Sequence, residues 1–96
     1  MSATITRHLS IRGLVQGVGF RQYMVFKAQQ LGIGGWVRNR SDGSVEAVVQ
    51  GTEDAVAAIV EYAQRGPRAS QVSGVTVSDV ENAGNFSGRF DPRRNA

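Results

Sequence analysis

The chain has 96 residues, of which 41% are apolar and 20% charged, a composition typical of one globular domain and not of a disordered chain. It contains no cysteine, and this excludes disulfides, thiolate nucleophiles and zinc–thiolate sites. The formal net charge is +3, and Lys27 is the only lysine among 11 basic residues. Arginine binds two oxygens of a phosphate or carboxylate at once. The charge therefore favours an anionic partner, although solvated surface arginines would give the same composition.

The first eight residues contain no apolar run of the kind found in a signal peptide. No stretch of the sequence is long and apolar enough to cross a bilayer. We therefore expect a cytoplasmic protein without a membrane partner.

The first part of the chain has two different hydrophobic periods. Over residues 5–12, apolar side chains such as Leu9 and Ile11 alternate with polar ones, which predicts a half-buried strand. After a glycine-rich stretch, apolar residues recur at helical spacing over 20–31. Gly32 can end this helix in a left-handed conformation.

A hairpin is expected next. Strands over 36–40 and 45–50 flank Asp42 and Gly43, a dipeptide typical of tight hairpin turns. The turn should bring the two strands together as an antiparallel pair.

A second helix is expected after the hairpin. Thr52 can cap it, and Glu53 and Asp54 in its first turn suit the helix dipole. An apolar stripe runs to Ala63, and Gly66 ends the helix. Two further strands are expected, over 72–80 and 86–90.

The order β-α-β-β-α-β, with a short final strand, predicts an α+β fold of the ferredoxin-like type. In this α/β sandwich, two helices cover one face of a mostly antiparallel sheet. We expect a single domain over residues 1–96, with residues 92–96 fraying. This fold serves many functions, so it does not identify one.

The segment GLVQGVGFR, residues 13–21, connects the first strand to the first helix. Main-chain N–H groups are unpaired at a helix start, and the helix dipole is positive there. Glycines at 13, 17 and 19 would let these groups turn inward around an anion. Arg21 is unfavourable in a first helical turn unless an anion is bound. The alternative is a plain tight connection with a solvated arginine.

Two common nucleotide-binding motifs are absent from this segment. A P-loop would need a lysine followed by a hydroxyl residue after its last glycine. A dinucleotide fingerprint starting at Gly17 would need glycine at position 22, where the chain has Gln22.

The segment at residues 13–21 resembles the signature of the acylphosphatases. A second block, GWVRN at residues 35–39 followed by DGSVE at 42–46, is similar to the same family in order and spacing. The resemblance covers nearly the whole chain and implies a ferredoxin-like fold as well. One departure lies near the end, where Gly88 occupies an apolar position of the family's last strand.

Acylphosphatases hydrolyse the carboxyl–phosphate bond of acyl phosphates without a metal or another cofactor. The resemblance implies that Arg21 holds the phosphate and that Asn39 positions the attacking water. Inorganic phosphate or sulfate is then the expected bound anion, and a small acyl phosphate the expected substrate. Main-chain N–H groups should complete the binding loop, and the residues concerned are Gln16, Gly17, Val18, Gly19 and Phe20.

The residue inventory suits this reaction. Phosphoryl transfer requires mainly positioning and charge stabilisation. A carboxylate leaves readily because the pKa of its conjugate acid is roughly 4, so no general acid is required. A chain with one histidine and no cluster of metal-ligand spacing can therefore catalyse it, but would be poorly equipped for alkyl phosphate esters.

Other chemistry-bearing residues have simpler interpretations. His8 falls on the polar face of the first strand, where the sequence indicates no partner for it. Asp42 is most simply a turn former. Trp36 and the phenylalanines are more typical of a core than of a stacking surface.

Two rival functions use the same fold. Arg38 and Arg40 near Trp36 could form a basic surface with an aromatic side chain for nucleic acid, but the consensus of the RNA recognition motif is absent. A non-catalytic anion sensor would keep the loop without turnover, and the presence of both Arg21 and Asn39 argues against it. We expect a monomeric enzyme without a nucleic-acid partner.

Overall fold

The computed structural model of the protein describes residues 3–96, and Met1 and Ser2 lie outside the described residues. Five strands and two helices are formed, in the order and at the positions that the hydrophobic periods predict for most of them. The elements are β1 (Thr4–Leu14), α1 (Phe20–Leu31), β2 (Gly34–Asn39), β3 (Val45–Thr52), α2 (Glu53–Arg65), β4 (Gln71–Asp79) and β5 (Phe90–Pro92).

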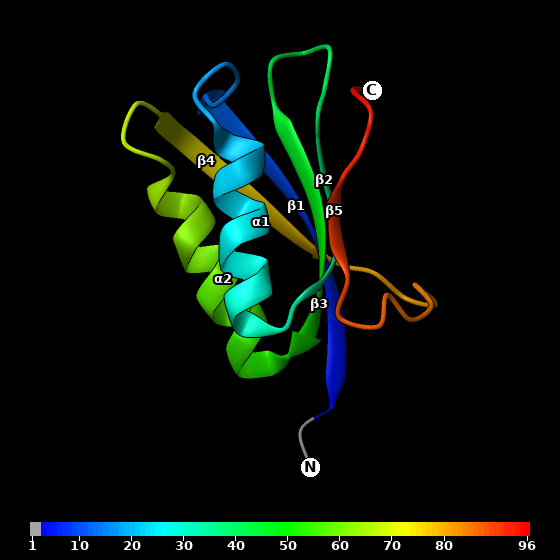
Figure 1. Ribbon diagram of the computed structural model, residues 1–96. Coiled ribbons are helices and arrows are strands. Elements are labelled where there is room, and N and C mark those ends of the chain that lie inside the picture. The colour runs from blue at the N-terminus through cyan, green and yellow to red at the C-terminus, as the bar shows by residue number, and fades with distance from the viewer. Residues whose placement is uncertain (1–2) are drawn as a thin grey trace.

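The strands form one sheet in the order β4-β1-β3-β2-β5. β1 pairs antiparallel with β3 and β4, and β2 pairs antiparallel with β3 and parallel with β5. Both helices cover the same face of this sheet, and the other face carries no helix (Figure 1). The predicted ferredoxin-like α/β sandwich with a mostly antiparallel sheet is confirmed. Within residues 3–96, no helix is long and apolar enough to span a membrane.

The core lies between the sheet and the two helices. Alternate residues of the central strands point into it, as the period of two requires. The helices contribute side chains that are three or four positions apart, such as Met24 and Ala28 of α1 or Val56 and Ile59 of α2. These side chains are almost completely removed from water, so their burial is the main stabilising contribution to the fold.

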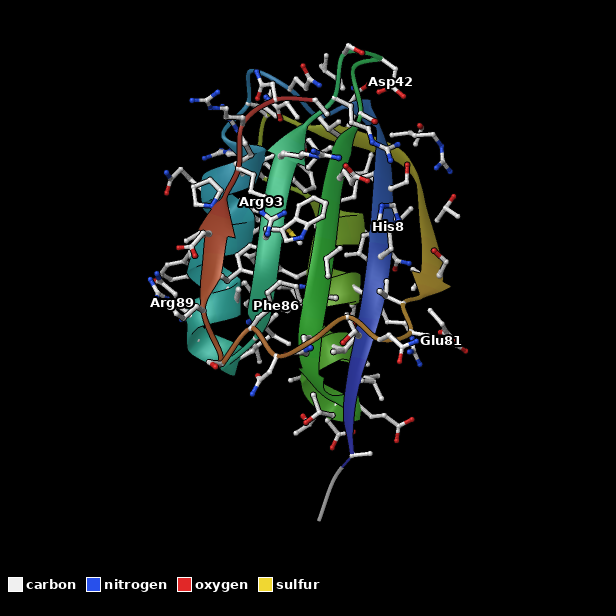
Figure 2. All side chains as sticks on the ribbon, turned by 90° about the vertical axis from the view of Figure 1, so that its right-hand side faces the viewer. His8, Asp42, Glu81, Phe86, Arg89 and Arg93 are labelled. Atoms are coloured by element: carbon white, nitrogen blue, oxygen red, sulfur yellow. The ribbon has the colours of Figure 1, made fainter. Side chains whose placement is uncertain are left out.

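The segment between β4 and β5 crosses the face of the sheet that has no helix, because these strands are the two edges (Figure 2). Gln50 of β3 fixes this segment to the sheet. Its amide donates to the Gly84 carbonyl at 2.7 Å and accepts from the Phe86 N–H at 3.0 Å. The last strand was expected at 86–90, but it starts at Phe90, because the preceding residues serve as the crossing.

Trp36 does not belong to the core, contrary to the sequence-based expectation. It lies on the helix-free face of the sheet and is half-buried. The guanidinium carbons of Arg38 and Arg93 lie 5.0 Å and 4.8 Å from its ring centroid, so the indole is covered by cations. The phenylalanines differ in burial: Phe20 and Phe90 are buried in the core as expected, while Phe26 is 58% exposed.

Residues 93–96 are hydrogen-bonded to β2 and to the turn that follows it, in the part of the chain, residues 92–96, for which the sequence predicts fraying. The Arg93 N–H donates to the Val37 carbonyl at 2.8 Å. The Ala96 N–H donates to the Asn39 carbonyl, and its own carbonyl accepts from Ser41, both at 2.9 Å. The edge of β2 beyond β5 offers unpaired main-chain groups, and the chain end satisfies them.

Glu46 of β3 is the centre of a charged cluster on the same face. Its side chain is only 8% exposed, and its two oxygens lie 2.6–2.7 Å from Arg38 Nε, Arg40 Nη2 and His8 Nε2. His8 therefore has a partner that the sequence did not indicate. Glu46 lies diagonally opposite it on β3, since His8 faces Val48 and Glu46 faces Ser10 in the ladder, and a local pattern does not reveal this contact. Burial raises the pKa of Glu46, but the hydrogen bonds from Arg40, His8 and Arg38 outweigh it and hold the pKa at about 2.

This cluster makes stability depend on pH. The pKa of Glu46 is about 2 in the fold against 4.5 for a free carboxyl, so its contribution is complete above pH 4.5 and is lost as the pH falls toward 2. We expect Glu46→Gln to lower the free energy of unfolding at pH 7 by about 1–3 kcal/mol. Denaturant unfolding at several pH values measures this, and the gap between wild type and variant should narrow below pH 4.5.

The control is Glu81→Gln, which removes an exposed carboxyl from the crossing segment. It should leave the unfolding free energy almost unchanged at every pH. A gap for Glu46→Gln that stayed constant down to pH 3 would contradict the role of the Glu46 carboxylate.

Candidate active site

The loop after β1 uses two glycines in left-handed conformations. Gly17 has φ 74° and Gly19 has φ 80°, values that residues with a side chain rarely adopt. A Cβ atom at either position would meet no atom within 4 Å. The glycines are therefore needed for the path of the backbone and not for close packing, which is the requirement of a loop that turns its N–H groups toward a ligand.

Gly13 has a different role from the one its sequence position suggested. It lies within β1, at the point where the register with β4 shifts. With φ 124°, a side chain there would collide with the Gln71 carbonyl. Gly13 therefore shapes the strand and does not belong to the anion-binding loop.

At the N-terminus of α1, no side chain of the described residues caps the main-chain N–H groups or balances the positive end of the helix dipole. Gly19 is the N-cap residue and has no side chain to accept a hydrogen bond, and the first turn contains no acidic residue. In α2, by contrast, Thr52 Oγ1 accepts from the Ala55 N–H at 3.2 Å, and Glu53 and Asp54 occupy the first turn. The start of α1 is therefore a suitable place for an anion, since its N–H groups and dipole remain uncompensated.

A pocket of about 290 Å³ opens at this helix start. The loop after β1, the β2–β3 hairpin and the end of the chain gather at the same end of the molecule (Figure 1). The pocket brings together five of the seven predicted site residues. Its lining consists of Val15, Gly17, Gly19, Phe20, Arg21, Gln22, Asn39 and Pro92.

Arg21 lies in the first turn of α1 and carries an unbalanced charge into the pocket. Its guanidinium forms no ion pair within residues 3–96, and its hydrogen-bond partner is a neutral side chain. Nη1 donates to Asn95 Oδ1 at 3.3 Å. Other arginines of the chain are paired with carboxylates, namely Arg7, Arg38, Arg40 and Arg65.

Asn39 is the last residue of β2 and is half-buried. Its main-chain carbonyl is used by Ala96, while its side-chain amide makes no hydrogen bond with the other described residues and lines the pocket. An amide with both its donor and its acceptor free can bind a water molecule in a fixed orientation.

Gln16 and Val18 do not line the pocket with their side chains. Gln16 Nε2 donates to the carbonyls of Arg40 and Ser44 at 2.6 Å and 2.8 Å, so the side chain ties the loop to the β2–β3 hairpin. Val18 packs against the core. Any contact of these two residues with an anion would therefore use their main-chain N–H groups.

Three lining residues were not predicted, namely Val15, Gln22 and Pro92. Val15 and Gln22 flank the predicted loop, so extending the motif by one residue on each side would have included them. Pro92 had no local signal, since the pairing of β5 with β2 alone brings it to the pocket.

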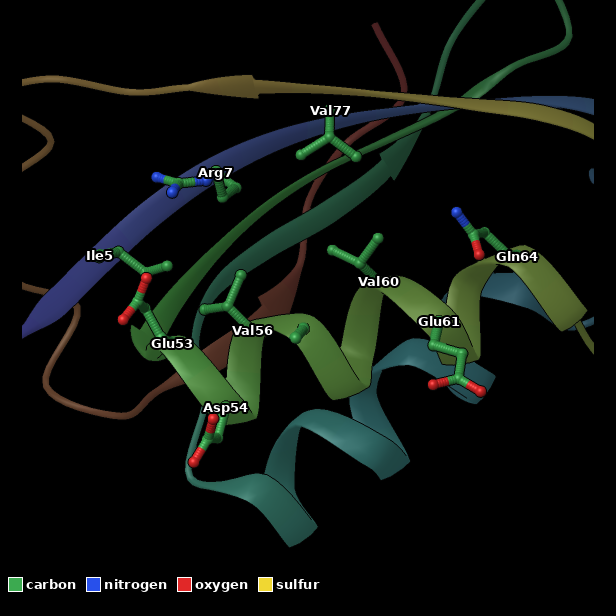
Figure 3. Close-up of a pocket in the computed structure, with 10 residues that line it drawn as sticks. Ile5, Arg7, Glu53, Asp54, Val56, Val60, Glu61, Gln64 and Val77 are labelled. Atoms are coloured by element: carbon green, nitrogen blue, oxygen red, sulfur yellow. The ribbon is translucent and has the colours of Figure 1, made fainter. Parts of the chain in front are cut away.

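A larger hollow, of about 860 Å³, lies away from Arg21 and Asn39, between α2 and the strands β1 and β4. Val60 of α2 and Val77 of β4 face each other across it (Figure 3). Its one cation, Arg7, is paired with Asp79. It is unsuited to an anion because three carboxylates lie along its rim, namely Glu53, Asp54 and Glu61.

The pocket at the start of α1 can bind and orient an anion, but it supplies no proton donor of the usual kind. Among its lining residues, Arg21 alone is titratable. The described residues contain no group of three or more His, Cys, Asp or Glu arranged to hold a metal ion. The arrangement therefore suits a reaction that depends on positioning and charge, with a leaving group that departs without protonation.

The chain is similar in sequence and in fold to known acylphosphatases. The acylphosphatase family model matches residues 7–92. An acylphosphatase from Thiobacillus denitrificans is 57% identical over 88 residues, which are 92% of this chain and 96% of the relative.

Two solved structures of acylphosphatases have the same fold as this chain. The chain superposes on an acylphosphatase from Bacillus subtilis with a TM-score of 0.88 at 32% identity, covering 93% of this chain and 98% of the other. For an acylphosphatase from Coxiella burnetii the values are 0.87 and 34%, with coverages of 94% and 93%. The sequence match and the fold lead to one conclusion: the chain belongs to the acylphosphatase family.

Proposed function

We propose that the pocket at the start of α1 hydrolyses small acyl phosphates to a carboxylate and inorganic phosphate. The observation that carries this proposal is the unpaired Arg21 guanidinium beside an uncapped helix N-terminus, in a pocket that also contains the free Asn39 amide. Membership in the acylphosphatase family supports the reaction type.

The phosphoryl group would bind between the loop and Arg21. The main-chain N–H groups of residues 16–20 would donate to its oxygens, where Gly17 and Gly19 permit the necessary turn. Arg21 would contact two further oxygens with its planar fork. Both contributions act on the charge that spreads over the phosphoryl oxygens in the transition state.

Asn39 would hold the attacking water at the opposite side of the pocket. Its amide accepts a hydrogen bond from the water and donates to a phosphoryl oxygen, which aligns the water for in-line attack. The water oxygen forms a bond to phosphorus as the bond to the carboxylate oxygen breaks. The carboxylate leaves with the bonding electrons, and the proton of the water passes to the released phosphate or to solvent.

The size of the pocket agrees with a small substrate. A volume of about 290 Å³ is at the lower limit of ligand pockets, so the pocket has room for a phosphoryl group together with a small acyl group. Inorganic phosphate and sulfate would compete for the same place.

We also propose that the enzyme acts as a monomer in the cytoplasm. The large apolar side chains exposed on the described surface, Leu14, Phe26 and Val77, are few and lie on three different elements, whereas a subunit interface typically has a continuous apolar patch. A basic nucleic-acid surface is disfavoured because Arg38 and Arg40 are paired with Glu46.

The proposed activity is tested by phosphate release from benzoyl phosphate in the presence of a chelator. Wild type should hydrolyse it, and Asn39→Ala should lose about 100- to 1,000-fold in kcat because one aligned group of this kind contributes about 3–4 kcal/mol. A folded wild type without hydrolysis would disprove the function. Full kcat in Asn39→Ala would disprove only the water-positioning role.

The variant Arg21→Lys should be much less active than wild type. Lysine keeps the positive charge but offers a single point of contact in place of a planar fork, so we expect kcat/KM at least 100-fold below that of wild type. Steady-state kinetics with benzoyl phosphate measure this. Turnover close to that of wild type would show that charge alone is sufficient.

Gln16→Leu should impair catalysis although the side chain does not line the pocket. The substitution keeps the size of the side chain and removes the donor to the Arg40 and Ser44 carbonyls, so the loop and the hairpin that carries Asn39 can move apart. We expect kcat/KM to fall on the order of 10-fold. Gln29→Leu, an exposed site at the far end of α1, is the control, and an equal effect in both variants would refute the coupling.

A further inference from the structure

The last residues of the chain form a strap along β2 that ends at the pocket. We define the strap as residues 93–96. Its main chain is bonded to Val37 at one end, at 2.8 Å, and to Asn39 and Ser41 at the other, both at 2.9 Å. The side chain of Arg93 reaches over the sheet beside β2 (Figure 2) and lies 4.8 Å from the Trp36 ring. Both ends of the strap are therefore fixed.

The strap places one polar side chain against the pocket. Asn95 Oδ1 accepts a hydrogen bond from Arg21 Nη1 at 3.3 Å. The adjacent Ala96 is bonded to the main chain of Asn39. One short segment thus contacts both residues that the mechanism uses, and neither contact serves the phosphate directly.

The contact with Asn95 limits the freedom of Arg21. A free arginine side chain has many rotamers and loses that freedom when it binds an anion. A partner that engages one arm of the guanidinium removes part of this cost in advance, while the other arm and Nε remain for the phosphate.

The neutrality of the partner matters as much as its position. A carboxylate in the place of the Asn95 amide would neutralise Arg21 and repel an incoming phosphate. An amide oxygen accepts the hydrogen bond and leaves the charge available. Arg21 is the one lining residue with a charge, so this distinction decides how strongly the pocket attracts an anion.

We propose that Asn95 is a positioning residue, which the strap holds against Arg21 so that the guanidinium is oriented toward the phosphate before it binds. This inference rests on the proposed function of the pocket. It assigns a catalytic purpose to a segment whose sequence predicts only a frayed end.

The test is direct binding of inorganic phosphate, by calorimetry or by an NMR titration, together with kinetics on benzoyl phosphate. Asn95→Ala should weaken phosphate binding about 3–10-fold and raise KM by the same factor, with kcat changed less than twofold. Asn95→Asp should weaken binding more than Asn95→Ala does. Gln30→Ala, which removes an exposed amide from the other end of α1, should change neither quantity.

A double-mutant cycle shows whether Asn95 acts through Arg21. In an Arg21→Gln background, the further change Asn95→Ala should alter the phosphate dissociation constant less than twofold. An equal loss in both backgrounds would overturn the proposal, as would an Asn95→Asp variant that binds phosphate as well as Asn95→Ala. Unfolding curves check that each variant is folded, which is expected because Asn95 is exposed.

Failure of this inference is separable from failure of the proposed function. If wild type binds phosphate, Arg21→Gln binds it more weakly, and Asn95→Ala binds like wild type, only the role of Asn95 is wrong. If wild type neither binds phosphate nor hydrolyses benzoyl phosphate, the proposed function is wrong and the inference with it.

Discussion

The direction of the strands is the constraint on which the candidate site depends. β1 and β2 are both antiparallel to the β3 strand between them, and β5 is parallel to β2. The C-terminal ends of all three strands therefore lie at the same end of the sheet. The glycine loop follows β1, Asn39 ends β2, and the strap follows β5. The loop and Asn39 line the pocket, and Asn95 of the strap contacts Arg21, although these three segments are far apart in the sequence.

Among residues 3–96, charged side chains are paired with one another on one part of this molecule and left without an ionic partner at the candidate site. On the helix-free face, Glu46 forms ion pairs with two arginines and contacts His8, so those side chains have partners within the fold. At the start of α1 the opposite holds, since Arg21 adds its charge to a helix end that lacks a cap. Such an arrangement costs stability in the absence of a ligand, and the cost is offset when an anion binds. A local rule is broken where the proposed chemistry requires it.

Local patterns predicted the elements and the loop, but not the contacts between distant segments. The two helices, the hairpin at Asp42 and the pocket residues Arg21 and Asn39 follow from periodicity, turn chemistry and the resemblance of two sequence blocks. The strap, the start of β5 at Phe90 and the pairing of His8 do not. Each of these depends on which distant segments the sheet brings side by side, and no pattern within ten residues carries that information.

The chemistry of the pocket lining limits the substrates more strongly than the fold does. Many proteins share this arrangement of helices and strands, but here the lining offers one fixed cation and one amide and no ordinary acid. A leaving group that needs protonation, such as an alkoxide, would depart slowly from such a site. A carboxylate departs unaided because it is already a stable anion near neutral pH. A site that only binds, orients and stabilises charge is therefore sufficient for a mixed anhydride of a carboxylic and a phosphoric acid, and insufficient for a phosphate ester.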